Sequence, residues 1–258
     1  AAVFACPACR GGLAATPEGA HCESCGARYP ATRGFLDLSG GIGDQYEPMT
    51  RNVPLRYSGI RPAFLRWKGS NWHPLITVED EDDYLRTHVE PVDGPILDLA
   101  AGTGRWTAVL AERFGPGRVL ALDLSTAMLD EIGRTQPDVV AVRGNALNLP
   151  FADASLGAVN CWNALQSLPD PAAAVAEVGR CLRPGGTFTV MTFRPSPDPL
   201  VRYFQTRPFG VVPVNLSDPD DLRGWLEKAG LTVREVYTPG TFLFVTAVRS
   251  DAAAGTIV

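Results

Sequence analysis

The sequence contains no apolar run that approaches eighteen residues, so it predicts no membrane-spanning helix. Its first residues, Ala1 to Phe4, do not form a secretory signal peptide. Internal repeats and low-complexity tracts are also missing. With 23 Lys and Arg against 28 Asp and Glu, the chain is not broadly basic. We therefore expect a cytoplasmic globular protein that has no membrane partner.

Cysteine is present in a pattern that points to a metal. Four of the six cysteines form two Cys-x-x-Cys pairs, Cys6 with Cys9 and Cys22 with Cys25, separated by twelve residues. Tetrahedral zinc takes four thiolates at about 2.3 Å, and each pair offers two of them from one tight turn. Disulfides suit secreted chains, and a redox site needs only one such pair. The sequence therefore predicts a structural zinc site in a small ribbon over residues 1–39.

A buried strand followed by a glycine-rich turn occurs near the middle of the chain. Residues 95–99 are apolar around Asp98, two glycines follow, and residues 105–114 have the pattern of an amphipathic helix. Residues 118–124 form a second apolar strand containing Asp123, at the place where cofactor-binding α/β sheets put a carboxylate on ribose hydroxyls. The dinucleotide pattern Gly-x-Gly-x-x-Gly fails because its third glycine is missing.

In these motifs the chain resembles the class I S-adenosylmethionine-dependent methyltransferases. The resemblance continues in order to about residue 193, through Leu-Pro-Phe-Ala-Asp at 149–153 and Leu-Arg-Pro-Gly-Gly at 182–186. It implies an α/β fold with a Rossmann-like sheet of seven strands, the last of them antiparallel. The strands 232–237 and 241–248 would form the closing hairpin. The implied cofactor is S-adenosylmethionine.

The resemblance also implies which residues hold the ribose and the methionine end of the cofactor. Asp98, Ala100, Gly102 and Gly104 stand in the positions of the first motif. Ala100 and the two glycines would allow close backbone approach to the methionine end, and Asp98 would serve that turn or the cofactor amino group. Asp123 would bind the ribose.

A second set of residues is assigned to the adenine and its surroundings. Leu124 and Met128 would flank the adenine, although ordinary core packing explains them equally well. Asn145 and Ala146 would meet its edge, and Asn163 would border the methionine moiety. Asn145 replaces the usual Asp, and its amide oxygen can still accept from the adenine amine.

Two further differences from the family remove acidic and basic groups. The frequent Phe-Asp before the fourth strand is Leu156-Gly157, and the frequent His-His pair is Gln166-Ser167. Gln166 and Ser167 therefore supply no histidine that could act as a base.

The segment 64–75 looks like a diverged form of a segment in the zinc-ribbon ribosomal RNA guanine-N1 methyltransferases. Trp72 takes the place of a tyrosine at the cofactor, and His73 follows it. His73 is a candidate general base because an ordinary histidine side chain titrates near neutrality, and a structural hydrogen-bonding role is the alternative. The segment lies where this fold often places a lid, and Tyr203, Phe204 and Arg207 are candidates for a substrate cover.

The domains predicted from these motifs are a zinc ribbon at 1–39, a linker and helical lid region at 40–90, and the methyltransferase domain at 91–258.

The leading function is in-line methyl transfer to a small-molecule acceptor in secondary metabolism. A ribosomal RNA guanine methyltransferase that uses the ribbon to bind RNA is the alternative. RNA affinity draws on clustered Lys and Arg, and residues 1–38 hold three arginines against three acids. A non-enzymatic cofactor-sensing protein is a third class, and the oligomeric state is not encoded in these motifs.

Overall fold

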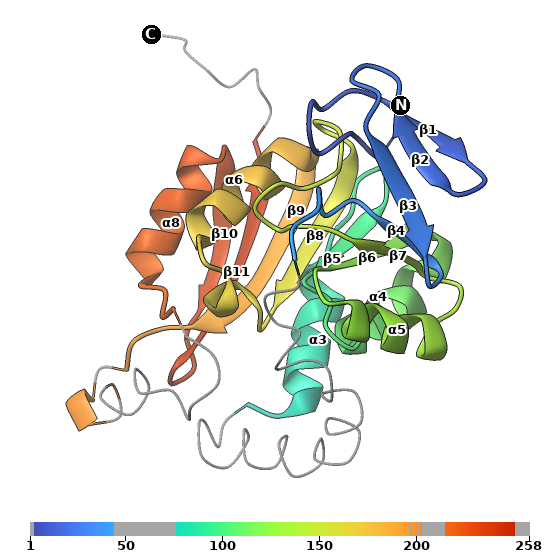
Figure 1. The fold of residues 1–258 in the computed structure, drawn as a ribbon. Helices are drawn as coiled ribbons and strands as arrows, with labels where there is room; N and C mark the ends of the chain where they lie inside the picture. Colours follow the sequence, from blue (N-terminus) through green and yellow to red (C-terminus); the bar gives the residue numbers. More distant parts are fainter. Residues whose placement is uncertain (1–2, 44–75, 197, 201, 203–214, 251–258) are drawn as a thin grey trace, which may run out of the picture.

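The N-terminal cysteine pairs lie in a small antiparallel meander. The structure, a computed structural model, describes residues 3–43, 76–196, 198–200, 202 and 215–250. The strands of the meander are β1 (Leu13–Thr16), β2 (Gly19–Cys22), β3 (Arg28–Thr32) and β4 (Phe35–Asp37). They pair in sequence order, each antiparallel to the next. Figure 1 shows this ribbon beside the main body of the protein.

The main sheet contains the expected seven strands. They are β5 (Ile96–Leu99), β6 (Val119–Asp123), β7 (Val140–Arg143), β8 (Leu156–Trp162), β9 (Leu182–Phe193), β10 (Leu231–Tyr237) and β11 (Phe242–Arg249). Their spatial order is β7-β6-β5-β8-β9-β11-β10. Strands β5 to β9 pair in parallel, and β11 is antiparallel to both of its neighbours.

The prediction of a sheet limited to seven strands was wrong. Strand β4 of the ribbon pairs in parallel with β7, where Leu36 lies opposite Val142 and Asp37 opposite Arg143. The described residues therefore form one sheet of eleven strands, in which the ribbon extends the edge of the main sheet. The pairing satisfies backbone groups that β7 would otherwise expose as an edge strand.

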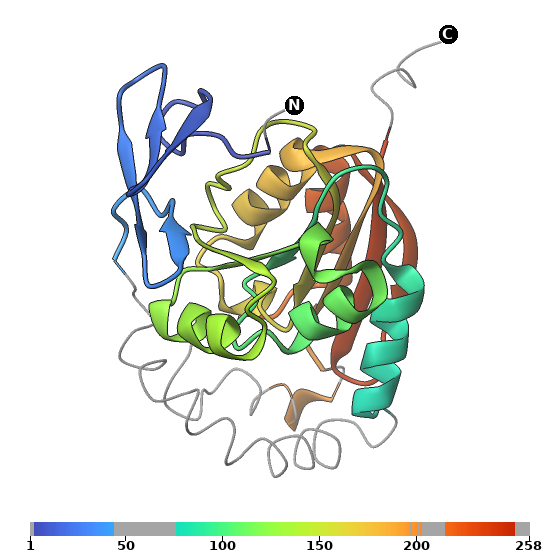
Figure 2. The same ribbon diagram turned by 90° about the vertical axis from the view of Figure 1, so that its right-hand side faces the viewer.

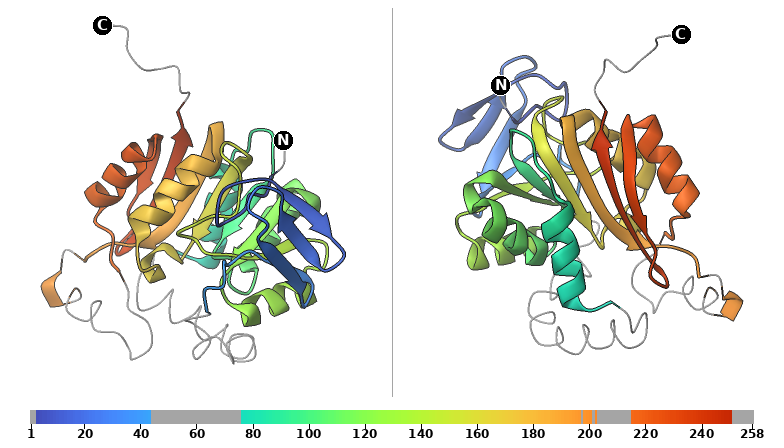
Figure 3. Two further views of the ribbon diagram at one scale, coloured as in Figure 1. Left: turned by 45° about the horizontal axis from the view of Figure 1, so that its top comes forward. Right: turned by 180° about the vertical axis from the view of Figure 1, so that it is seen from behind.

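Helices cover both faces of the main sheet (Figures 2 and 3). They are α3 (Val78–His88), α4 (Arg105–Phe114), α5 (Thr126–Thr135), α6 (Pro171–Cys181) and α8 (Pro219–Lys228), with short 3-10 turns η2 (Pro116–Arg118) and η3 (Leu165–Ser167). Alternate residues of β5 serve two cores: Leu97 packs with residues of α6 and α8, and Ile96 packs with residues of α3, α4 and α5. Burial on both faces is the reason the strand is apolar apart from Asp98. In the described part of the chain no helix is long and apolar enough to cross a membrane.

The ribbon is attached to the main body by more than its strand pairing. The Ala5 N–H donates to the Pro150 carbonyl at 3.0 Å, and the rings of Phe4 and Phe151 lie 5.5 Å apart. The Arg10 guanidinium donates to the Leu149 carbonyl at 2.7 Å. These contacts hold the ribbon against the end of the sheet that contains β7.

Candidate cofactor-binding site

The strand order reverses at β5, because β6 lies on one side of it and β8 on the other. In open α/β sheets, ligands bind outside the carboxyl ends of the strands at such a switch point. Ala100 directly follows β5 with φ 56°, and Asn163 directly follows β8 with φ 55°. Left-handed conformations at non-glycine residues cluster at functional sites. The switch point is therefore the candidate site.

Asp98 is buried at this switch point and hydrogen-bonds to two neighbouring elements. Its carboxylate accepts a hydrogen bond from Thr107 Oγ1 at 2.6 Å and one from Asn160 Nδ2 at 2.7 Å. Burial raises the pKa of Asp98 to about 6, against the lowering effect of these two hydrogen bonds. The contacts join β5 to α4 and β8, so they favour the first of the two roles predicted for Asp98, which is to support the turn.

Asp123 ends β6, and two backbone groups orient its carboxylate. Gly102 N–H donates to one oxygen at 2.8 Å, and Ser125 N–H donates to the other at 2.9 Å. The turn after β5 and the start of α5 thus fix one carboxylate at the mouth of the switch point. A fixed carboxylate is what recognition of a pair of ribose hydroxyls requires.

The two glycines of the turn have different surroundings. A Cβ on Gly102 would meet no atom within 4 Å, so its backbone borders open space. A Cβ on Gly104 would lie 2.5 Å from Gln136 Nε2 and 2.8 Å from Ile132 Cγ1. Gly104 is therefore needed for the packing of α4 against α5, whereas Gly102 leaves room for a ligand to approach the backbone.

A cavity of about 210 Å³ opens beside these groups. Five of the predicted cofactor residues line it, namely Ala100, Asp123, Leu124, Asn145 and Ala146. Six residues that the sequence did not indicate line it as well: Ile42, Leu122, Gly144, Leu147, Leu168 and Pro169. The walls are mostly apolar, as is common in small-molecule sites. Alternation along β6 could have indicated Leu122, but no motif marks Ile42, which follows the ribbon.

The remaining predicted cofactor residues either do not line this cavity or lie outside the described residues. Asn163 is held by Gln166, whose Nε2 donates to Asn163 Oδ1 at 3.1 Å. Met128 is half-buried on α5 and does not line the cavity. Trp72 and the candidate base His73 lie outside the described residues.

The substrate-cover candidates Tyr203, Phe204 and Arg207 also lie outside the described residues.

The four N-terminal cysteines come together in the ribbon. Their sulfur atoms all lie within 4.8 Å of one another, with Cys6 and Cys25 3.7 Å apart and Cys9 and Cys22 3.4 Å apart. A tetrahedron of sulfurs 2.3 Å from a central ion has edges of about 3.8 Å, so this set has the size that zinc requires. The hydroxyl of Tyr29 lies 2.9 Å from the sulfur of Cys6 and is placed to donate to a thiolate there.

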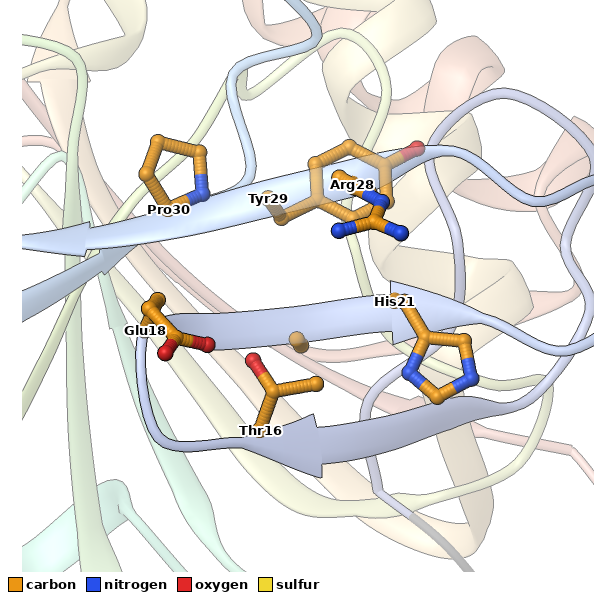
Figure 4. A pocket seen from close by; sticks show the side chains of 7 residues that line it. Thr16, Glu18, His21, Arg28, Tyr29 and Pro30 are labelled. Atoms are coloured by element: carbon orange, nitrogen blue, oxygen red, sulfur yellow. The ribbon is translucent and has the colours of Figure 1, made fainter.

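A second cavity, of about 500 Å³, lies along the strands of the ribbon (Figure 4). Its lining comes from β1, β2 and β3 and the turn between the first two, and includes Thr16, Glu18, His21 and Arg28. Although it is larger than the cavity at the switch point, none of its lining residues belongs to the main sheet. It is therefore separate from the candidate cofactor site.

The comparisons with known proteins agree with the geometry of the switch point. A family model described as a methyltransferase domain matches residues 96–186. An uncharacterized chloroplastic methyltransferase of Arabidopsis thaliana is 30% identical over 219 residues, which cover 74% of this chain and 61% of that protein. A demethylmenaquinone methyltransferase of Lactiplantibacillus plantarum is 38% identical over 114 residues, which cover 42% of this chain and 48% of that protein. The chain thus spans about three fifths and about half of these two relatives.

A solved structure has the same fold. It comes from the complex of the Haloferax volcanii Trm112 methyltransferase activator with a methyltransferase. The match has a TM-score of 0.61 at 20% identity and covers 82% of this chain and 100% of that one.

Proposed function

Because the chain contains a class I S-adenosylmethionine-dependent methyltransferase domain, we propose that the protein transfers the methyl group of S-adenosylmethionine to a small-molecule acceptor. One observation carries the proposal: the carboxylate of Asp123, oriented by the Gly102 N–H, lines one cavity at the switch point together with Ala100 and Asn145. We assign this cavity to the adenosine end of the cofactor. The cytoplasmic location and a setting in secondary metabolism stay predictions from the sequence.

In this assignment the chain's residues bind and orient, which is what an in-line displacement chiefly requires. Asp123 accepts from the ribose hydroxyls, and Leu124 and the other apolar walls enclose the adenine. Asn145 and Ala146 lie at the adenine edge, and the turn with Gly102 approaches the methionine end. When bound, the cofactor supplies an electrophilic methyl group on a sulfonium.

We also propose that the cysteine cluster holds a structural zinc ion. Four thiolates complete a tetrahedral coordination, so no position would remain for a substrate. The core of the ribbon is small: Cys6, Cys22, Tyr29 and Leu38 are buried together with Val142 of β7. Metal binding would therefore supply much of its stability.

The contacts of the ribbon arginines favour a small-molecule acceptor over RNA. Arg10 pairs with Glu177 at 3.0 Å, and Arg33 pairs with Asp130 at 2.9 Å. Both are therefore used in contacts with the methyltransferase domain. Of the three ribbon arginines, only Arg28 makes no ion pair within the described residues. One cation is a weak anchor for RNA, whose binding depends on several phosphate contacts.

The test is to incubate the protein with methyl-labelled S-adenosylmethionine and, separately, total RNA or a metabolite extract. We expect label in a small organic product and none in RNA. Label in RNA would establish the alternative acceptor. Label in neither pool, with cofactor binding intact, would favour a cofactor-sensing protein.

A further inference from the structure

Arg143, the last residue of β7, makes an unusual set of contacts at the junction of ribbon and main sheet. Its Nε donates to the Leu124 carbonyl at 3.0 Å, and its Nη2 donates to the Ile42 carbonyl at 3.0 Å. Its Nη1 pairs with Asp37 at 2.8 Å and donates to Ser39 Oγ at 3.2 Å. The guanidinium thus donates to four acceptors from two parts of the chain.

Two of these acceptors belong to the walls of the candidate cofactor cavity. Leu124 follows the ribose-facing Asp123, and Ile42 comes from the segment that leaves the ribbon. No other side chain is shown to bond both wall residues within the described part of the chain. One planar group, whose fork of donors is rigid, therefore bridges these two walls.

The ion pair that anchors this group is well protected. Side-chain exposure is 12% for Arg143 and 23% for Asp37. Although partial burial acts to raise it, the pKa of Asp37 is lowered by hydrogen bonds from Ser39 and by Arg143. Asp37 is thus ionised at neutral pH and holds the guanidinium in one orientation.

We propose that Arg143 is a positioning residue for the adenosine end of S-adenosylmethionine, acting through the backbones of Leu124 and Ile42. The inference rests on the proposed function. It makes the ribbon part of the cofactor site, because Ile42 and the acceptors Asp37 and Ser39 all come from the N-terminal segment. The adenosine end is affected most, since the two walls lie beside Asp123 and Asn145.

The experiment measures binding of S-adenosylmethionine and of adenosine by calorimetry to the full chain and to Arg143→Met and Arg143→Lys. Arg10→Met is the matched control. Arg10 also donates to a backbone carbonyl and pairs with an acid across the same junction, yet neither Leu149 nor Glu177 lines the cavity. The zinc content and the melting temperature of each variant are recorded alongside.

For Arg143→Met we expect both ligands to bind about 10 to 100 times more weakly, the range that corresponds to losing a charged hydrogen bond. Arg143→Lys should give an intermediate loss, because an ammonium cannot reach both carbonyls in fixed geometry. Arg10→Met should bind as the parent does. If Arg143→Met fails to fold, Arg143→Lys and Asp37→Asn provide the test, each with an expected several-fold loss.

Parental affinity in the Arg143 variants, or an equal loss in Arg10→Met, would overturn the proposal. A loss for S-adenosylmethionine without one for adenosine would also overturn it. Failure of the parent protein to bind S-adenosylmethionine is a different result, which would remove the proposed function itself.

Discussion

At the scale of single residues, two glycines of one turn should respond differently to the same substitution. Gly102→Ala should still fold, but its free energy of unfolding should fall by about 1 to 2 kcal/mol. Alanine is strained at φ 57°, although the space beside it is open. It should bind S-adenosylmethionine much more weakly. Gly104→Ala should lose more stability, since its methyl group would clash with Gln136 and Ile132. Denaturation and calorimetry on both variants check the contrast, which would be absent if both glycines faced the ligand.

The buried carboxyl of Asp98 predicts a pH dependence of stability. Burial raises its pKa from 3.8 to about 6, so between these values the folded state keeps a proton that the unfolded state has released. The stability due to the protonated form is complete below about pH 4 and is lost as the pH rises to about 6. We expect the free energy of unfolding to fall by roughly 3 kcal/mol over this range relative to Asp98→Asn, which cannot ionise. Urea titrations at several pH values measure the difference, and a difference that does not vary with pH would contradict the assignment.

The sequence predicted part of the site at this scale because its motifs are local. Asp123 ends one buried strand and Ala100 directly follows another, and such positions gather at one edge of a parallel sheet. Gly104 matched the same motif, yet its surroundings depend on how α5 packs, which the motif does not encode. Ile42 and Leu168 come from segments far away in the chain, and only the tertiary fold brings them to the cavity.

At the scale of elements, Gln166 of the turn η3 links the ends of β8 and β9 through hydrogen bonds. The side-chain amide of Gln166 donates to Asn163 and accepts from Thr192 Oγ1 at 3.2 Å, and the backbone carbonyl of Gln166 accepts from the Asn215 N–H at 2.8 Å. Gln166→Leu would remove the partner of the buried Thr192 hydroxyl and of the half-buried Asn163 amide oxygen, at a cost of about 2 kcal/mol. Thr192→Val, which removes only one of these bonds, should cost less. Thermal denaturation compares the stability of the two variants. An equal loss of stability in both would show that the Gln166 amide does not link Asn163 to Thr192.

Strand and helix positions followed from periodicity, because alternating and helical patterns are properties of short segments. The closing hairpin of β10 and β11 was predicted in this way and is present. The pairing of β4 with β7 was not predicted. Edge strands carry no local signal that names their partner, so a three-residue strand of the ribbon could not be assigned to the main sheet from its sequence.

For the whole molecule, continuity of the ribbon with the sheet predicts that metal removal affects more than the ribbon. We expect one zinc per chain, lost in Cys22→Ser. We expect the melting temperature of the entire protein to fall on the order of 10 °C, because structural zinc contributes folding free energy directly. Metal analysis and calorimetry test this together. Zinc loss with an unchanged main transition would show that the ribbon is an independent appendage.

The central claim is that S-adenosylmethionine occupies the cavity at the switch point with its ribose on Asp123. The most direct measurement is titration of the cofactor into the parent protein, Asp123→Ala and Asp138→Ala, the last an exposed acid outside the cavity. Binding should be strong in the parent, unchanged in Asp138→Ala and weaker by about 10 to 100 times in Asp123→Ala. Equal affinity of all three proteins would contradict the account.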